Sequence, residues 1–290
     1  MEEKESSKEK LIENINIRNQ VRNNLISREQ ILPDTLEETI CCCCISYDLT
    51  VQEYKLFNLL KKKVIQSYNA QNPEHEKTLK DLFNKTKELL NNDNNSSEIT
   101  EITTKESNNE NKDEEKIWRK IGFQTKEPRN DFRAGGIYSL DLMIYFINNY
   151  EKDYINIINE EYFTFALACI RVSYLIRNFL YLLTYDEIRI NSKFQRNIIA
   201  NRKQLKYFCY FLFDNSNLLN DICCICILSI FQKFKEKKTG QKEKNYLIIE
   251  PIIQNSVQCL QNSFNDARLN EDFISHLKQS YRLNFLNALV

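Results

Sequence analysis

The segment from residue 118 to residue 146 gathers the rare residue types of this 290-residue chain: its only Trp and three of its four glycines. Asp131 stands two residues before Arg133, and Gly135 and Gly136 follow closely. A loop shaped by Pro and Gly that ends at a helix start can present a side chain in a fixed direction. Arg133 is the side chain in this loop with the greatest chemical reach, because its guanidinium combines delocalised charge with paired hydrogen-bond donors.

Two groups of cysteines suggest other chemistry, and both are poor metal sites. Cys41–Cys44 are adjacent, whereas tetrahedral zinc needs spaced ligands around which the backbone can wrap. They are either sites of S-acylation, which would anchor the chain to a membrane, or a run of small apolar residues at a helix start. Cys223, Cys224 and Cys226 lie in an apolar run, so we expect them to pack in the core.

An enzyme that hydrolyses nucleotides by itself is disfavoured by what the sequence lacks. It has only two histidines, His75 and His276, and neither a Walker-type phosphate loop nor a dinucleotide-binding fingerprint. Its 40 basic and 40 acidic residues cancel, so the overall charge gives no attraction to nucleic acid. We therefore expect no metal, no cofactor and no nucleic-acid partner.

One local charge cluster departs from this balance. Residues 189–206 carry six positive charges and no negative charge. Such a stretch either meets an acidic partner or an anionic membrane surface, or forms the solvated face of a helix.

The composition predicts an all-α fold. Four Gly and four Pro are too few for many strands joined by tight turns, whereas helices joined by polar loops need few. The first ten residues contain no apolar signal region, so we interpret the ten cysteines as reduced thiols of a cytoplasmic protein. The most apolar stretch, 162–183, contains Arg171 and Arg177, which favours a buried helix over a membrane span.

Five regions follow from the pattern along the chain. Residues 1–45 are polar and are expected to be flexible, and 46–90 form an N-terminal helical part with apolar residues at three- and four-residue steps. Residues 91–115 carry eight acidic residues, two lysines and almost no large apolar side chains, which predicts a disordered linker or insertion. Residues 116–245 hold the densest apolar helices, and 246–290 hold further C-terminal helices.

The helix boundaries are predicted from caps, apolar periodicity and breakers. We expect Ser139 to be the N-cap of the helix after the loop, and Pro251 to break the C-terminal helical part. The other predicted helices begin near Val51 and near Pro73, and span roughly 162–183, 194–214 and 222–234.

The loop resembles the signature of the ELMO domain family, W-x3-GFQ-x3-P-x2-DFR-x-G. Nine residues match this signature in register: Trp118, Gly122, Phe123, Gln124, Pro128, Asp131, Phe132, Arg133 and Gly136. The following "SLDLMIYF" resembles the family's leucine-rich helix, and "YFCYFLFD" at 207–214 resembles its aromatic helix. Upstream, 67–83 resembles the segment that precedes the signature in short members, so the resemblance covers about residues 50–240.

This resemblance implies a compact all-helical ELMO domain that acts with a small GTPase. Long members of the family are scaffolds that help an exchange-factor partner to activate Rac-type GTPases, and they carry further regions for which this chain has no room. Short members are GTPase-activating proteins for Arf-like GTPases, with the signature arginine as the proposed catalytic residue. By length and by its upstream match the chain resembles the short class.

On this interpretation Arg133 enters the GTPase as an arginine finger, and Asp131 or nearby carbonyl groups orient it. Gly135 and Gly136 let the loop approach the nucleotide pocket. The remaining signature residues shape the loop or contact the partner: Trp118, Gly122, Phe123, Gln124, Pro128 and Phe132. The family usually has Gly directly after the arginine, where this chain has Ala134, and a Cβ there is costly if the position needs a positive φ.

Two alternatives remain open. Arg133 and Asp131 could form a local ion pair that closes the loop over the helical core, which would make the chain a non-catalytic adaptor for a GTPase or an exchange factor. A membrane-tethered trafficking adaptor would instead use Cys41–Cys44 and the basic stretch 189–206.

Overall fold

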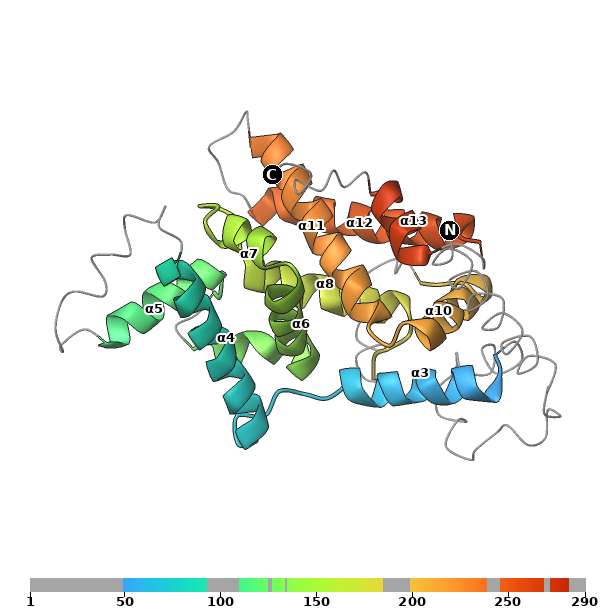
Figure 1. Cartoon of the computed structure of the whole chain (residues 1–290), viewed down its shortest axis with the longest axis horizontal. Coiled ribbons are helices and arrows are strands. Elements are labelled where there is room, and N and C mark those ends of the chain that lie inside the picture. The colour runs from blue at the N-terminus through green and yellow to red at the C-terminus, as the bar shows by residue number, and fades with distance from the viewer. Residues whose placement is uncertain are drawn as a thin grey trace, which may run out of the picture.

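The computed structural model describes residues 49–92, 110–124, 127–133, 135–184, 199–238, 246–268 and 272–281. Within these ranges every regular element is helical (Figure 1), so the all-α prediction is confirmed. The elements are α3 (Val51–Val64), α4 (Pro73–Asn92), α5 (Glu110–Ile121), the 3-10 helix η3 (Pro128–Arg133), α6 (Gly136–Asn149), α7 (Glu151–Ile158), α8 (Phe165–Phe179), α10 (Arg202–Asp214), α11 (Leu218–Lys238), α12 (Tyr246–Asp266) and α13 (Phe273–Ser280).

One apolar core joins all these helices, from Leu49 before α3 to Tyr281 after α13. α8 is its centre, because 12 of its 15 residues are buried and it packs against α6, α11, α12 and η3. α4 and α5 lie at one end of the molecule and α3 packs on α10 at the other (Figure 1). The loop between α5 and α6 is therefore held between the α4–α5 end and the central helix.

Side-chain caps explain where several helices begin. Thr50 Oγ1 accepts a hydrogen bond from the Glu53 N–H (3.2 Å), and Glu53 Oε2 accepts one from the Thr50 N–H (2.9 Å), a capping box at the start of α3. Asn201 and Gln204 form the same arrangement at the start of α10. This box places the beginning of α10 at Arg202, which corrects the predicted start near residue 194.

The predicted N-cap of α6 at Ser139 is wrong. The helix begins at Gly136 with Gly135 as its N-cap, and Ser139 is buried inside the first turn, where its hydroxyl donates to the Gly136 carbonyl (2.9 Å). The free N–H of Ile137 is satisfied by the Gln66 carbonyl (3.1 Å), a neighbouring segment, so this helix start needs no side-chain cap.

Three further boundaries differ from the prediction. Pro251 does not break the helix but lies within the second turn of α12, where its missing N–H removes a single helical hydrogen bond. α7 was not predicted, because the turn at Tyr150 between α6 and α7 carries no Gly or Pro. α5 begins at Glu110, inside the predicted acidic linker, because acidic residues suit the positive end of a helix dipole.

The predicted buried helix at 162–183 is α8, which is shorter than expected, with Arg177 only 1 % exposed. No single helix among the described residues is long and apolar enough to cross a membrane; α10 and α11 meet that test only together, with a bend of 110° between them. Cys41–Cys44, the acidic residues 93–109 and most of the basic stretch 189–206 lie outside the described residues.

Candidate functional site

The first end of the loop is fixed by Gly122, which follows α5 with a φ of +97°. Its N–H donates to the Arg119 carbonyl (3.0 Å) and the next N–H, of Phe123, donates to the Trp118 carbonyl (3.1 Å), the bonding pattern of a Schellman motif. A Cβ at Gly122 would lie 2.7 Å from the backbone nitrogen of Phe165 at the start of α8. Gly122 is therefore required both by its backbone conformation and by the close approach of α8.

The second end is fixed by Gly136, whose φ is +60°. A Cβ here would lie 2.4 Å from the Gln66 carbonyl oxygen, the same oxygen that accepts the Ile137 N–H. The loop thus returns into α6 with its backbone pressed against the segment that follows α3.

Aromatic side chains connect the loop to the α4–α5 end of the core. Ring centroids lie 5.1 Å apart for Phe83 and Trp118, 5.5 Å for Trp118 and Phe123, and 5.6 Å for Phe123 and Phe132. The row ends with Tyr68 stacked on Phe132 at 5.0 Å. Phe132 is only 1 % exposed, so this residue holds η3 to the core, with the buried Pro128 at the first position of the 3-10 helix.

Asp131 closes the neck of the loop. Its Oδ2 accepts a hydrogen bond from the Gln124 N–H at 2.8 Å, seven residues earlier. The alternative in which Asp131 and Arg133 form an ion pair is not supported, because among the described residues the two side chains form none. Asp131 acts on the backbone of the loop instead. A role of Asp131 or nearby carbonyl groups in orienting the Arg133 guanidinium stays a prediction.

Arg133 lies at the end of η3 with an exposed side chain. Its Nη2 donates to Asn130 Oδ1 at 3.5 Å, a long hydrogen bond between residues that share a face of a 3-10 helix. Gln124 is also exposed, whereas Gly135 is buried with a φ of −93° at the N-cap of α6. Ala134 lies outside the described residues, so the expected cost of its Cβ stays a prediction.

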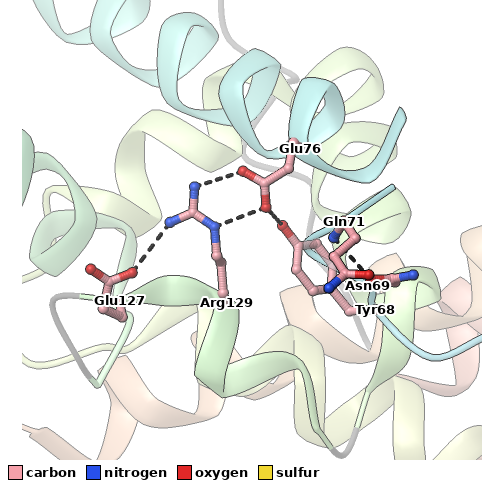
Figure 2. A network of polar contacts seen from close by, with 6 residues as sticks. All are labelled: Tyr68, Asn69, Gln71, Glu76, Glu127 and Arg129. Atoms are coloured by element: carbon pink, nitrogen blue, oxygen red, sulfur yellow. Dashed lines mark hydrogen bonds and ion pairs between the residues drawn. The ribbon is translucent and has the colours of Figure 1, made fainter. Parts of the chain in front are cut away.

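The same 3-10 helix carries a second arginine, Arg129, which the sequence does not mark as functional. Arg129 donates from Nε to Glu76 Oε1 (2.8 Å) and from Nη2 to Glu76 Oε2 (2.6 Å), so two parallel hydrogen bonds join η3 to α4. Figure 2 shows this guanidinium between Glu76 and Glu127, with the Tyr68 hydroxyl donating to Glu76 Oε1 at 2.7 Å. No sequence pattern connects Arg129 with Glu76, because 53 residues separate them.

The pKa values in this network follow from its contacts. Hydrogen bonds from Arg129 lower the pKa of Glu76 below its ordinary value, and the carboxylate raises the pKa of the guanidinium further. Burial, and next the hydrogen bond to Glu76, raise the pKa of the Tyr68 hydroxyl. The carboxylate is therefore charged and the phenol neutral throughout the physiological range.

A groove of about 850 Å³ borders this network. Apolar and aromatic side chains line it together with charged ones. The lining residues are Pro73, Glu76, Lys77, Leu79, Lys80, Phe83, Asn84, Glu114, Glu115, Trp118, Glu127, Pro128 and Arg129. The groove thus adjoins the loop that carries Arg133, on the side of α4 and α5.

Fold and site together define a class: an all-helical domain that presents an exposed arginine from a short, tightly framed 3-10 helix. The chain belongs to the ELMO/CED-12 family, whose model matches residues 58–248, more than half of the chain. The match includes every residue of the loop, which confirms the resemblance seen in the signature.

Two curated relatives come from Dictyostelium discoideum. ELMO domain-containing protein A is 46 % identical over 44 residues, which are 15 % of this chain and 4 % of the relative. Ankyrin repeat and ELMO domain-containing protein D is 32 % identical over 120 residues, 39 % of this chain and 8 % of the relative. The matches thus span less than a tenth of either relative. No solved structure gives a significant match to the chain.

Proposed function

We propose that this chain stimulates GTP hydrolysis by a small GTPase of the Arf-like class, with Arg133 as an arginine finger. The observation that carries the proposal is the contrast within one short 3-10 helix between Phe132, which is buried, and Arg133, whose guanidinium is exposed. Membership of the ELMO/CED-12 family, linked to small-GTPase pathways, supports a GTPase as the partner.

The chemistry of the reaction explains why an arginine is needed. Charge is spread over the phosphoryl oxygens in the transition state of GTP hydrolysis, and a GTPase alone compensates this charge slowly. A guanidinium from a partner supplies planar, delocalised charge and several donors at once, whereas the ammonium of Lys is a compact point charge. Arginine fingers in other systems increase the rate by a factor on the order of 10³–10⁵.

The surroundings of Arg133 suit this task. Among the described residues its guanidinium has one hydrogen bond, to Asn130, and this bond is long, so little interaction is lost when the guanidinium moves to a phosphate. The backbone, in contrast, is held on both sides of Arg133, at Gly136 and by the hydrogen bond between Asp131 and the Gln124 N–H, which favours a defined approach of Arg133 to the GTPase.

The test is a single-turnover GTP-hydrolysis assay with a panel of Arf-like GTPases, Rac-type GTPases included for comparison. We expect stimulation by the chain, and a loss on the order of 10³-fold in the stimulated rate for both Arg133→Ala and Arg133→Lys. Binding of the GTPase should persist in both variants. Arg119→Ala is the control, because Arg119 is an exposed arginine on α5 outside the loop, and it should leave the stimulated rate unchanged.

A second function, GTPase binding without catalysis, is favoured by the groove beside the loop. Aromatic and charged side chains line it together, a composition suited to a protein segment. An adaptor would bind a GTPase or an exchange factor and leave the hydrolysis rate unchanged. Full stimulation by Arg133→Lys would reject the finger, and binding without stimulation by the wild-type chain would establish the adaptor.

A further inference from the structure

The Arg129–Glu76 pair is a partly exposed ion pair in which both hydrogen bonds of the guanidinium–carboxylate fork are formed. The two N···O distances are 2.8 and 2.6 Å, and the side chains are 44 % and 30 % exposed. Pairs with this exposure contribute little to stability, since water screens the charges and both side chains lose freedom. A bidentate fork does, however, fix the mutual orientation of the two groups.

The fork acts on the element that carries Arg133. In a 3-10 helix, residues three apart share a face. Arg129 and Phe132 therefore lie on one face, and both are held at the same place: Arg129 by Glu76, and Phe132 by the ring of Tyr68, whose hydroxyl donates to Glu76. Asn130 and Arg133 form the other face.

We infer that Arg129 and Glu76 are positioning residues that set the direction in which Arg133 leaves η3. The fork fixes the rotation of this short helix about its own axis, and Figure 2 shows it reaching from η3 to α4. The inference rests on the proposed function of Arg133. It assigns a task to Arg129, which the family signature does not include.

A second fork in the same molecule provides a matched control. Arg171 on α8 donates to Glu250 on α12 from Nε (3.0 Å to Oε2) and from Nη2 (2.6 Å to Oε1), with side chains 31 % and 30 % exposed. It joins two core helices, and neither residue lies on η3, α4 or α5. If the loss of any fork lowers the stimulated hydrolysis rate, substitutions at both pairs should lower it. If the fork acts through the arginine finger, only the substitution of Arg129 should lower it.

The experiment compares Arg129→Lys with Arg171→Lys in the stimulated hydrolysis assay. Lys retains the charge and loses the fork. We expect Arg129→Lys to lower the stimulated kcat by about 10-fold to 100-fold, because small misplacements of a catalytic group are costly, with KM for the GTPase within about twofold of wild type. Glu76→Gln should have a similar effect, and Arg171→Lys none. Equal kcat values for Arg129→Lys and wild type would overturn the inference, as would equal losses at the two forks.

Hydrogen exchange of the amides in 127–133 gives a readout that needs no GTPase. Without the fork these amides should exchange at least about fivefold faster, with those of α8 and α12 unchanged. If the wild-type chain stimulates no GTPase, the proposed function fails. Unchanged amide exchange in Arg129→Lys would then also overturn the role of the Arg129–Glu76 fork in holding η3. If Arg129→Lys does not fold, Glu76→Gln carries both measurements.

Discussion

The two faces of η3 have opposite surroundings. On one face Phe132 is buried to 1 % exposure and stacks on Tyr68, and on the other Asn130 and Arg133 are exposed and touch each other through one long hydrogen bond. Only three residues per turn separate these environments. The same short helix thus holds one residue, Phe132, by packing in the core and leaves another, Arg133, open to a partner.

This contrast separates stability from activity. Burial and close backbone approach determine the free energy of unfolding, whereas the exposed guanidinium contributes almost nothing to it. Substitutions on the buried face should therefore lower stability, and substitutions of Arg133 should lower the rate without lowering stability. The predictions below test that separation in order of decreasing effect on stability.

The largest effect is expected for Phe132→Ala. Removing a buried aromatic ring leaves a cavity next to Tyr68 and Phe123 and should cost about 3–5 kcal/mol of unfolding free energy. Urea denaturation followed by circular dichroism measures the loss. Phe213→Ala is the matched control, because Phe213 is 42 % exposed, and it should cost less than about 1 kcal/mol. Similar losses for the two variants would show that burial of the ring does not account for the effect of Phe132→Ala.

The next largest effect is expected for Gly136→Ala, which should lower the free energy of unfolding by about 2–4 kcal/mol. A left-handed backbone costs an L-residue roughly 1–2 kcal/mol, and a clash with the Gln66 carbonyl adds a similar amount. Gly136→Asn separates the two causes, since Asn tolerates positive φ but keeps the Cβ. Asn should remain clearly destabilising in thermal and urea unfolding. Full recovery with Asn would show that conformation alone, and not the approach of Gln66, requires glycine here.

Asp131→Ala should cost less, about 1 kcal/mol, the typical net value of one hydrogen bond. The bond is from the Gln124 N–H, so exchange of that single amide should accelerate. Asp131→Asn keeps a carbonyl oxygen as acceptor and should retain most of the protection. If Asn and Ala behave alike, the charge of Asp131, and not the hydrogen bond, closes the loop.

Much of the fold followed from the sequence because helices were encoded by composition and periodicity. The scarcity of Gly and Pro, the apolar steps in α3 and α4 and the apolar run in α11 all favour helices without reference to the rest of the chain. The error at the start of α6 arises where another segment contributes to the boundary. The helix begins at Gly136 and not after Ser139, and the Gln66 carbonyl accepts the Ile137 N–H there, a contact with no local signal.

The sequence predicts which residues form the loop of the site, but not which groups these residues contact. Spacing placed Gly122, Phe132 and Gly136 in one loop, and their burial or positive φ explains why these types are needed. The hydrogen-bond partner of Asp131 depends on the folded path of the loop, because that partner is the backbone N–H of Gln124 and not a side chain. The Arg129–Glu76 fork was hidden for the same reason, because its two residues meet only after α4 packs beside η3.

The smallest effect on stability is expected on the polar side, from titration of Glu76. Its pKa in the folded state is lowered by the hydrogen bonds from Arg129, so the fork stabilises the folded chain above the unfolded value of about 4.3 and this contribution disappears as pH falls through the folded pKa. The difference in unfolding free energy between wild type and Glu76→Gln should therefore be below about 1 kcal/mol at neutral pH and approach zero once the pH lies below the lowered pKa of Glu76 in the folded chain. Glu250, whose pKa Arg171 lowers in the same way, should give the same profile with Glu250→Gln. The two forks would then contribute equally to the free energy of unfolding. A fall in stimulated hydrolysis with Glu76→Gln but not with Glu250→Gln would show that the forks differ in their place in the fold and not in the strength of the ion pair.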